Sequence, residues 1–192
     1  VHMFAHKNKY FLIIESTKDI DLKNIKLRNK IYIVYRNLKK QEEMVDLYKF
    51  TRTCKLKGIK FYIANNIRLA ISVRADGIYI SAHNNSLRYL SHKNSKFEMI
   101  GSAHNLKEIK IKILQGCHAI LYSKLFTVSY DMKSPFLGVI KFNNISRIHK
   151  VLIPLGGINL DNLNSLNMIK SSGLALMSQI KKKPAKIINR LF

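Results

Sequence analysis

Short apolar runs alternate with amphipathic segments along most of the chain. Between most of the runs apolar residues recur at spacings of three and four, as in Leu106, Ile109 and Ile113, and this spacing lines one face of a helix. Because strands that are connected through helices pair in parallel, the pattern predicts a parallel sheet covered by helices. The runs with the length of buried strands lie at residues 10–14, 30–35, 59–64, 77–81, 97–101, 118–122, 150–155 and 173–178.

Glycine marks several boundaries where a predicted helix gives way to a predicted strand. An apolar run follows Gly58, Gly77, Gly116 and Gly173. Glycine can adopt the left-handed conformation that ends a helix without steric cost. Eight strands in this alternation predict a (βα)8 TIM barrel of minimal size, formed by a single domain over residues 1–192, with residues 1–3 interpreted as a cloning remnant. An open doubly wound sheet is the structural alternative.

Two connections depart from the regular alternation. The first, between residues 15 and 29, is polar and weakly periodic, so we expect the first helix to be short or missing. The second, residues 127–138, follows the sixth strand without a clear period. In a barrel the loops that follow the strands build the active site, so this long loop is a functional candidate.

Composition limits the cellular setting. With 47% hydrophobic residues, the 192-residue chain can bury a full core. No apolar run approaches the roughly 20 residues that span a bilayer, and no basic-then-apolar leader opens the sequence, so we expect a cytoplasmic protein without a membrane partner. Cys54 and Cys117 are too few and too far apart for a disulfide framework or a metal cluster, which fits a reducing compartment.

The charge is strongly positive: 34 Lys and Arg against 11 Asp and Glu give a formal net charge of +23. Such a field attracts polyanions, and nucleic acid is one of them. The lysines are spread through nearly every predicted helix, however, whereas a nucleic-acid footprint gathers on one face. Genomic composition bias together with a phosphate site is therefore the favoured explanation, and a nucleic-acid groove is the weaker one.

Glycines near the end of the chain stand where barrels bind phosphate. Gly156 and Gly157 let the backbone approach a ligand where the seventh strand meets its helix, and Ser178 follows the eighth strand. Phosphate sites of TIM barrels are built from these two loops and a helix N-terminus. A tight turn without a ligand is the alternative explanation for the two glycines.

Three side chains add polar chemistry to other strand ends. Ser102 could donate to a phosphate oxygen, and His104 could move a proton near neutral pH. Arg36 could bind an anion through its guanidinium fork. The alternatives are hydrogen bonds at a helix start for His104 and a solvated surface position for Arg36.

Five motifs occur at the strand ends in this order: F-Y-I-A-N-N-I-R-L-A, A-D-G-I-Y-I, I-G-S-A-H-N-L-K-E, I-L-Y-S-K-L-F-T-V-S and L-G-G-I-N. In this order and spacing they resemble thiamine phosphate synthase and its TenI relatives, over about Ile31 to Ile180. The resemblance implies a (βα)8 barrel. It also implies either the synthase reaction, which joins hydroxymethylpyrimidine diphosphate to a thiazole phosphate and releases pyrophosphate, or a TenI-type role such as thiazole tautomerisation.

The resemblance also assigns roles by position. It implies that Ser102 contacts pyrophosphate and that His104 moves protons, which makes these two residues the catalytic candidates. The positions that it assigns to substrate or phosphate binding are Arg36, Lys39, Asn65, Thr127, Ser129, Lys133, Gly156, Gly157 and Ser178.

The magnesium site that the resemblance implies has lost its carboxylates. The family holds the metal with aspartates at two positions where this chain has Asn66 and Asn84. Because magnesium prefers anionic oxygen ligands, the two amides should weaken metal binding markedly. Lys124 stands where the family usually has proline, and with Arg36 and Lys133 it could neutralise a departing pyrophosphate in place of the metal.

Three functions stay open at this point. The first is a thiamine phosphate synthase-like transferase or TenI-like protein that binds small-molecule phosphates, with a homodimer as one possible assembly. The second is a non-catalytic or regulatory family member that keeps the phosphate site without the metal. The third is a basic barrel that binds nucleic acid, motivated by the charge alone.

Overall fold

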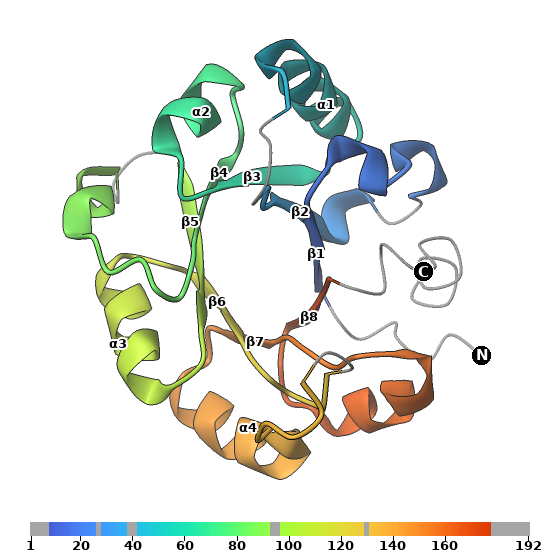
Figure 1. Ribbon diagram of the computed structural model, residues 1–192, viewed down its shortest axis with the longest axis vertical. Coiled ribbons are helices and arrows are strands. Elements are labelled where there is room, and N and C mark those ends of the chain that lie inside the picture. The colour runs from blue at the N-terminus through green and yellow to red at the C-terminus, as the bar shows by residue number, and fades with distance from the viewer. Residues whose placement is uncertain (1–7, 26–27, 38–41, 93–96, 129–130, 178–192) are drawn as a thin grey trace.

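The computed structural model describes residues 8–25, 28–37, 42–92, 97–128 and 131–177 (Figure 1). Eight parallel strands form a ring, and the helices lie around its outside. The strand order is β7-β6-β5-β4-β3-β2-β1-β8, and a bridge between Leu155 and Ala175 joins the two ends of the sheet. The strands are β1 (Lys9–Ile14), β2 (Ile31–Tyr35), β3 (Lys60–Ala64), β4 (Gly77–Ile80), β5 (Glu98–Ala103), β6 (Ala119–Tyr122), β7 (Leu152–Pro154) and β8 (Gly173–Leu176).

This arrangement confirms the predicted (βα)8 barrel. From β1 to β7 each strand pairs with its successor in the sequence, and β8 pairs with β1. That order is typical of a barrel, whereas an open doubly wound sheet reverses its strand order at a switch point. All eight predicted strands are present, and their boundaries differ from the predicted ones by at most two residues.

The connections are less regular than the strands. The α-helices are α1 (Met44–Leu56), α2 (Ile67–Ser72), α3 (Leu106–Leu114) and α4 (Gly138–Ile148), and they follow β2, β3, β5 and β6. The described residues of the first connection form only the short 3-10 helices η1 (Thr17–Asp19), η2 (Leu22–Asn24) and η3 (Arg28–Lys30), which confirms the prediction that the first helix is short or missing. The connections after β4 and β7 contain the 3-10 helices η4 (Leu87–His92) and η5 (Leu160–Met168).

Two helices, α3 and η5, begin with an asparagine cap. Asn105 Oδ1 accepts from the Glu108 amide at 2.9 Å at the start of α3. Asn159 Oδ1 accepts from the amides of Asp161 and Asn162 at 2.9 and 3.1 Å. Asparagine at this position satisfies backbone donors that have no partner within the helix. Both capped helices follow a strand directly, so their first turns lie at the carboxyl end of the barrel.

The core has two layers because the strands are buried on both faces, as expected for parallel strands under helices. The outer layer, between the sheet and its helices, includes Leu47, Ile109 and Phe142. The inner layer, inside the ring, consists of Phe11, Ile13, Tyr32, Val34, Tyr62, Tyr79, Ile100, Ala119, Leu121, Ile153 and Ala175.

None of the described helices combines the length and the apolar composition that a membrane-spanning helix needs.

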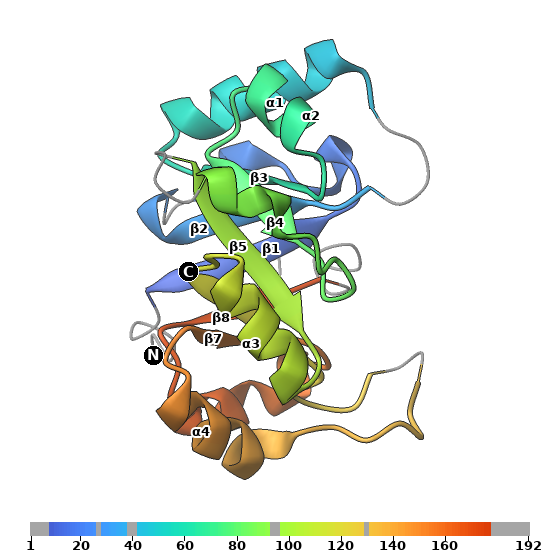
Figure 2. The same ribbon diagram turned by 90° about the vertical axis from the view of Figure 1, so that its left-hand side faces the viewer.

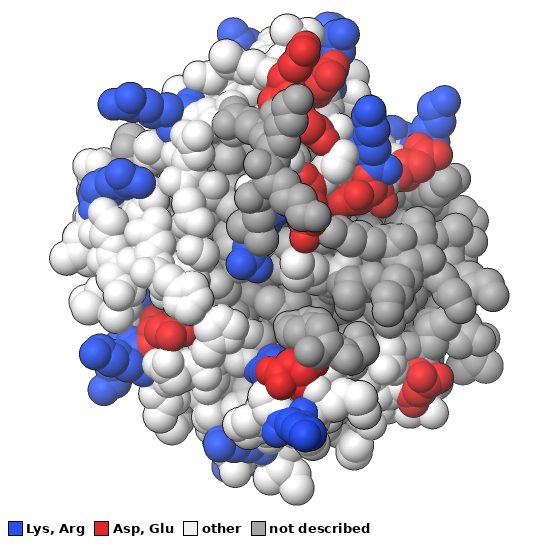
Figure 3. All heavy atoms as spheres, viewed as in Figure 1, with Lys and Arg blue, Asp and Glu red and all other residues white. Residues whose placement is uncertain are grey.

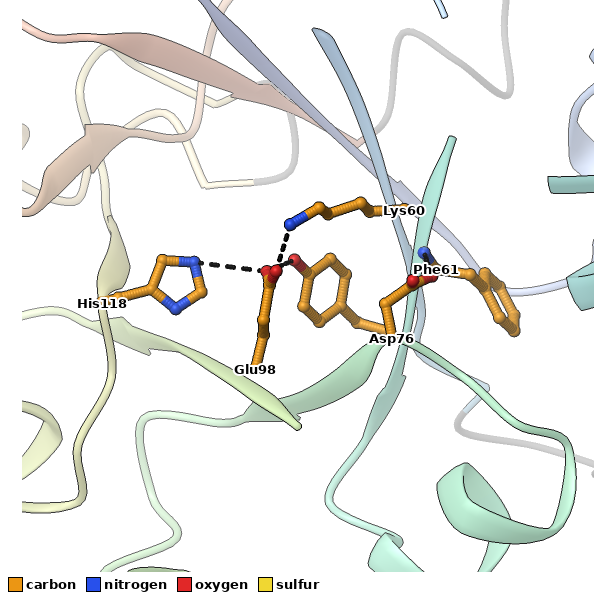
Figure 4. Close-up of polar contacts among 6 residues, drawn as sticks. Lys60, Phe61, Asp76, Glu98 and His118 are labelled. Carbon is orange, nitrogen blue, oxygen red and sulfur yellow. Dashed lines mark hydrogen bonds and ion pairs between the residues drawn. The ribbon is translucent and has the colours of Figure 1, made fainter. Parts of the chain in front are cut away.

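A polar network occupies the amino end of the barrel (Figure 4). Glu98 begins β5, and its carboxylate forms an ion pair with Lys60, which begins β3. The same carboxylate accepts a hydrogen bond from the Tyr62 hydroxyl at 2.5 Å, and its Oε2 lies 3.7 Å from His118 Nε2. Each of these groups therefore has a partner at the end of the barrel where strands begin.

Candidate functional site

A cavity of about 680 Å³ lies at the carboxyl end of the barrel. Its volume falls within the roughly 300–1,000 Å³ of small-molecule sites. Its lining comes from the ends of β2, β4, β5, β6, β7 and β8 and from the loops that follow them, which is where barrel enzymes bind their ligands. Figure 2 shows the β6–α4 loop extending outward from the barrel. The cavity therefore lies where the sequence predicts the site.

The charged side chains that line the cavity are cationic. Arg36 follows β2 and Lys124 follows β6, while no Asp or Glu of the described residues is part of the lining. His83 and His104 also line the cavity, and their ring centroids are 6.1 Å apart. Two fixed cations without a lining carboxylate favour an anionic ligand.

Tyr79 and Ser102 form the polar part of the cavity floor. Their side chains are hydrogen-bonded to each other. Burial raises the pKa of Tyr79, and the bond to Ser102 and the charge of Arg36 oppose this only in part. The phenol therefore stays neutral at physiological pH. Ser102 is 6% exposed, so its hydroxyl is held at the end of β5 with little freedom.

The two glycines after β7 lie directly against the loop after β6. Gly157 has a φ of +69°, and a Cβ there would meet the Phe126 carbonyl oxygen at 2.4 Å. The Phe126 amide donates to the Gly156 carbonyl at 3.1 Å, and the Leu125 amide donates to the Leu155 carbonyl at 2.9 Å. Only glycine permits both this conformation and this close approach. The predicted turn is therefore joined to a second loop that also lines the cavity.

His104 and Ser123 form a polar pair at the cavity wall. His104 Nδ1 lies 2.8 Å from Ser123 Oγ, at hydrogen-bond distance. The His104 backbone amide donates to Glu108 Oε2 at 2.7 Å, so the start of α3 fixes the main chain at this point. The imidazole borders the cavity, which leaves it able to exchange a proton with a ligand.

Lys124 is held in place by the loop that follows β6. Its Nζ donates to Asp131 Oδ2 at 2.8 Å and also contacts Ser134 Oγ. The charge of Lys124, mainly through this hydrogen bond, lowers the pKa of Asp131. Lys124 also accepts a backbone hydrogen bond at 2.8 Å from the Leu137 amide. Asp131 and Ser134 thus hold the ammonium group beside the cavity, and Leu137 holds the main chain of Lys124.

The asparagines at the predicted metal positions are engaged in structural hydrogen bonds. Asn66 caps α2, with its Oδ1 accepting from the Leu69 amide at 3.0 Å. Asn84 Nδ2 donates to Asn65 Oδ1 at 3.1 Å and to the Tyr89 hydroxyl at 2.9 Å. The Asn84 carbonyl accepts from Lys112 Nζ at 2.7 Å. These asparagines tie the ends of β3 and β4 to neighbouring helices.

Magnesium, which the family resemblance implies, does not fit this donor set. The oxygens of Asn65, Asn66 and Asn84 are used by amide donors, and none of these residues lines the cavity. In the described part of the chain, no group of three or more His, Cys, Asp or Glu could hold a metal ion. A hard cation needs several oxygen ligands, with carboxylates preferred. The described residues supply cations at the cavity instead.

The structure brings some of the predicted site residues together at the cavity and places others elsewhere. Thr127 and Lys133 are not part of the lining. Lys39, Ser129 and Ser178 lie outside the described residues. The roles assigned to all of these residues stay predictions. The predicted residues that line the cavity are Arg36, Ser102, His104, Gly156 and Gly157.

Sequence reasoning missed five polar residues of the lining, which are Tyr79, Ser81, His83, Ser123 and Ser134. Ser123 directly follows a predicted strand, and His83 comes two residues after the end of another, so position alone could have identified both. Tyr79 lies inside a strand, where an aromatic residue suggests packing. Its polar end reaches the cavity because its side chain points into the ring.

These features define a (βα)8 barrel protein with a cavity suited to small anions at the carboxyl ends of its strands. The chain belongs to the thiamine monophosphate synthase family, whose model matches residues 5–180. This membership confirms the resemblance seen in the sequence motifs.

Individual relatives are distant. The chain is 25% identical over 176 residues to a thiamine-phosphate synthase of Clostridioides difficile (strain 630), over 90% of this chain and 80% of the relative. It is 22% identical over 183 residues to a thiamine-phosphate synthase of Methanococcus vannielii, over 92% of this chain and 89% of the relative. The similarity thus extends over most of both proteins.

Solved structures share the fold. Thiamine phosphate pyrophosphorylase from Pyrococcus furiosus matches with a TM-score of 0.73 and 18% identity, over 97% of this chain and 94% of that chain. The 3-keto-L-gulonate-6-phosphate decarboxylase from Vibrio cholerae matches with a TM-score of 0.64 and 14% identity, over 97% of this chain and 99% of that chain. At these identities the likeness establishes the barrel fold.

Proposed function

We propose that this chain is a thiamine phosphate synthase-like transferase. It binds a thiazole phosphate and hydroxymethylpyrimidine diphosphate in the cavity and joins them with release of pyrophosphate. The observation that carries the proposal is the cavity itself, which combines Arg36 and Lys124 with the turn at Gly156 and Gly157 and has no carboxylate among its described lining. Membership of the family supports the same reaction.

The proposed chemistry needs an environment that stabilises negative charge. The thiazole ring nitrogen attacks the methylene carbon of the pyrimidine, and the bond from that carbon to the diphosphate oxygen breaks. The electron pair of this bond leaves with pyrophosphate. Fixed positive charges and hydrogen-bond donors that face the leaving group lower the barrier to this step.

Six of the cavity residues have a direct role in this proposal. The turn at Gly156 and Gly157 offers backbone groups to the thiazole phosphate, and Arg36 offers a guanidinium fork to the pyrimidine diphosphate. Ser102 donates its hydroxyl to the departing pyrophosphate. The pair formed by His104 and Ser123 supplies a proton-exchanging group beside the reacting centre.

A second candidate is a non-catalytic family member that binds the phosphate ligands without turnover. It is favoured by Asn66 and Asn84, whose amides stand at the family's metal positions and form structural hydrogen bonds. Magnesium-dependent chemistry would then be lost while the anion-binding cavity is kept. The two candidates differ in turnover and agree on binding.

The test uses the purified full chain with both substrates, with magnesium or with a chelator. Formation of thiamine phosphate together with an equal amount of pyrophosphate is the expected result. Arg36→Met should lower kcat/KM by about 10- to 100-fold, because a charge-assisted contact is lost. Arg147→Met, at the exposed last turn of α4, is the matched control. Ligand binding without any product at high enzyme concentration would favour the second candidate.

The remaining predictions concern partners and location. On the face shown in Figure 3, the described Lys and Arg side chains are scattered and interspersed with Asp and Glu, which gives no support to a nucleic-acid groove on that face. Loss of RNA binding near 150 mM salt would remove that alternative. The homodimer stays a prediction, which light scattering tests, and so does the cytoplasmic location.

A further inference from the structure

We propose that Lys124 holds the diphosphate group of the ligand in this cavity in place of a magnesium ion. The chain would then bind pyrophosphate without metal. The inference rests on the proposed function, because it concerns the charge that stabilises the leaving group of that reaction. It departs from the metal site that the family resemblance implies.

Lys124 lies beside the diglycine turn. Its Cα and Cβ would lie 3.3 and 3.5 Å from a Cβ placed on Gly156, so its side chain begins directly beside the diglycine turn. Lys124 lines the cavity, and 22% of its side chain is exposed. The residue therefore places a long cationic side chain next to the backbone groups proposed to receive phosphate.

Neighbouring side chains hold the ammonium group of Lys124 in place. Lysine has three donors on Nζ. In the described structure two partners hold this group, Asp131 and Ser134. A third donor is left for a phosphate oxygen, and the two partners reduce the rotamer freedom that the side chain would otherwise lose on binding. Lys124 is in this sense preorganised for an anion.

Positive charge predominates among the described residues that line the cavity. Arg36 and Lys124 come from strands on different sides of the ring, and no described Asp or Glu lines the space between them. Asp131 neutralises Lys124 only weakly, because 43% of its carboxyl side chain is exposed to solvent. A diphosphate can therefore meet one cation from each side. A divalent metal would instead approach two like charges.

The experiment measures binding of inorganic pyrophosphate to the full chain by calorimetry, once with EDTA and once with magnesium. The parent protein is expected to bind in EDTA, with less than about a threefold gain from magnesium. Lys124→Met should weaken binding by about 10-fold or more, since a hydrogen bond to a charged group is lost. The control Lys150→Met removes an equal charge at an exposed position just before β7, at the opposite end of the barrel. Its affinity for pyrophosphate should stay within about twofold of the parent value.

A second variant shows whether the loss of binding comes from a folding defect or from the lost charge. Lys124→Gln keeps a donor for Asp131 and Ser134 and removes the charge, so it should fold like the parent and bind pyrophosphate as weakly as Lys124→Met. Binding that requires magnesium, or a Lys124→Gln protein that binds like the parent, would overturn the inference. In either case retained binding of thiazole phosphate would leave the proposed function standing. A parent protein that binds neither ligand would remove both.

Discussion

At the amino end of the barrel the Glu98 carboxylate meets Lys60, Tyr62 and His118, whereas at the carboxyl end Arg36 and Lys124 border a cavity without a carboxylate in its described lining. Both ends carry charged side chains on the starts or ends of parallel strands. At the amino end opposite charges meet one another, whereas at the carboxyl end Arg36 and Lys124, whose partner Asp131 is exposed, border a space of about 680 Å³.

The difference shows how one fold separates stability from binding. Charges that are paired only with one another contribute to folding, while charges that border an open cavity remain available to a ligand, even where an exposed carboxylate is also a partner, as Asp131 is for Lys124. Substitutions at the amino end should therefore change stability with little effect on binding. Substitutions at the carboxyl end should instead change ligand binding with little effect on stability.

The largest effect is expected for Gly157→Ala. Its φ of +69° and the Phe126 carbonyl oxygen, which would lie 2.4 Å from an added Cβ, leave no room for a methyl group. The turn must move away from the loop after β6. We expect at least about a 100-fold loss of kcat/KM, because displacing a substrate-positioning group by about 1 Å can have this effect. Turnover assays on the folded variant provide the measurement.

Gly138→Ala is the control for this prediction. Gly138 has the same φ of +69°, but its nearest neighbour to an added Cβ is Phe136 Cε2 at 4.0 Å. This variant carries the backbone strain, about 1 kcal/mol, without the clash. Equal losses of activity in both variants would show that strain, and not the contact between the two loops, accounts for the effect.

At the amino end, Glu98→Gln should lower the free energy of unfolding by about 1–2 kcal/mol, because Lys60 loses its counter-charge and Tyr62 loses a charged acceptor. Urea unfolding measures the change, with Asp46→Asn on the exposed side of α1 as the control. The activity of the folded fraction should equal that of the parent. A drop in kcat/KM without a loss of stability would break the proposed division between the two ends.

Sequence reasoning succeeded for the strands because each one is an apolar run with polar or glycine boundaries. The sequence is less informative about the connection after β7. The spacing of Leu160, Leu163 and Leu166 is three throughout, which matches the three residues per turn of η5 better than the 3.6 of an α-helix. Periodicity over so short a segment does not separate the two helix types, and packing against the sheet decides between them.

The candidate site was predictable only in outline, as Asn65 illustrates. Its place at the end of β3 follows from the sequence, but its φ of +57° does not. In this conformation its side chain receives hydrogen bonds from Ser81 and Asn84. Which way a strand-end side chain turns depends on contacts between segments that are far apart in the sequence. Position therefore predicted the end of the barrel correctly and could not predict which side chains line the cavity.

A smaller effect should appear in the pH dependence of stability. Burial lowers the pKa of His118, and Glu98 opposes this only in part. Its pKa in the folded protein is therefore below the ordinary 6.5, so the unfolded chain binds the proton more readily and stability falls as the pH drops below 6.5. His118→Gln should reduce the loss of stability between pH 7.5 and 5.5, as urea unfolding would show. An unchanged slope would mean that other groups cause the acid sensitivity.

The Glu98 carboxylate acts in a lower pH range. Burial raises its pKa, but the hydrogen bonds from Lys60 and Tyr62 outweigh burial and bring the pKa below 4.5. Its contribution to stability is therefore complete above pH 4.5 and is lost as the pH falls through the lower folded value. The two residues can thus be separated, since His118 acts between pH 7.5 and 5.5 and Glu98 acts below that range.

The smallest effect is expected for Asp131→Asn, at the carboxyl end. The substitution removes the negative charge beside Lys124 and keeps an amide oxygen that can accept from Nζ, with Ser134 as the second partner. Because exposed ion pairs contribute only about 0.2–1 kcal/mol, pyrophosphate binding should become tighter by no more than about fivefold. Calorimetry in EDTA measures this, and 0.5 M salt should abolish the gain through screening. Weaker binding would instead show that the Asp131 carboxylate is needed to position Lys124, and that its competition with the ligand for Lys124 matters less.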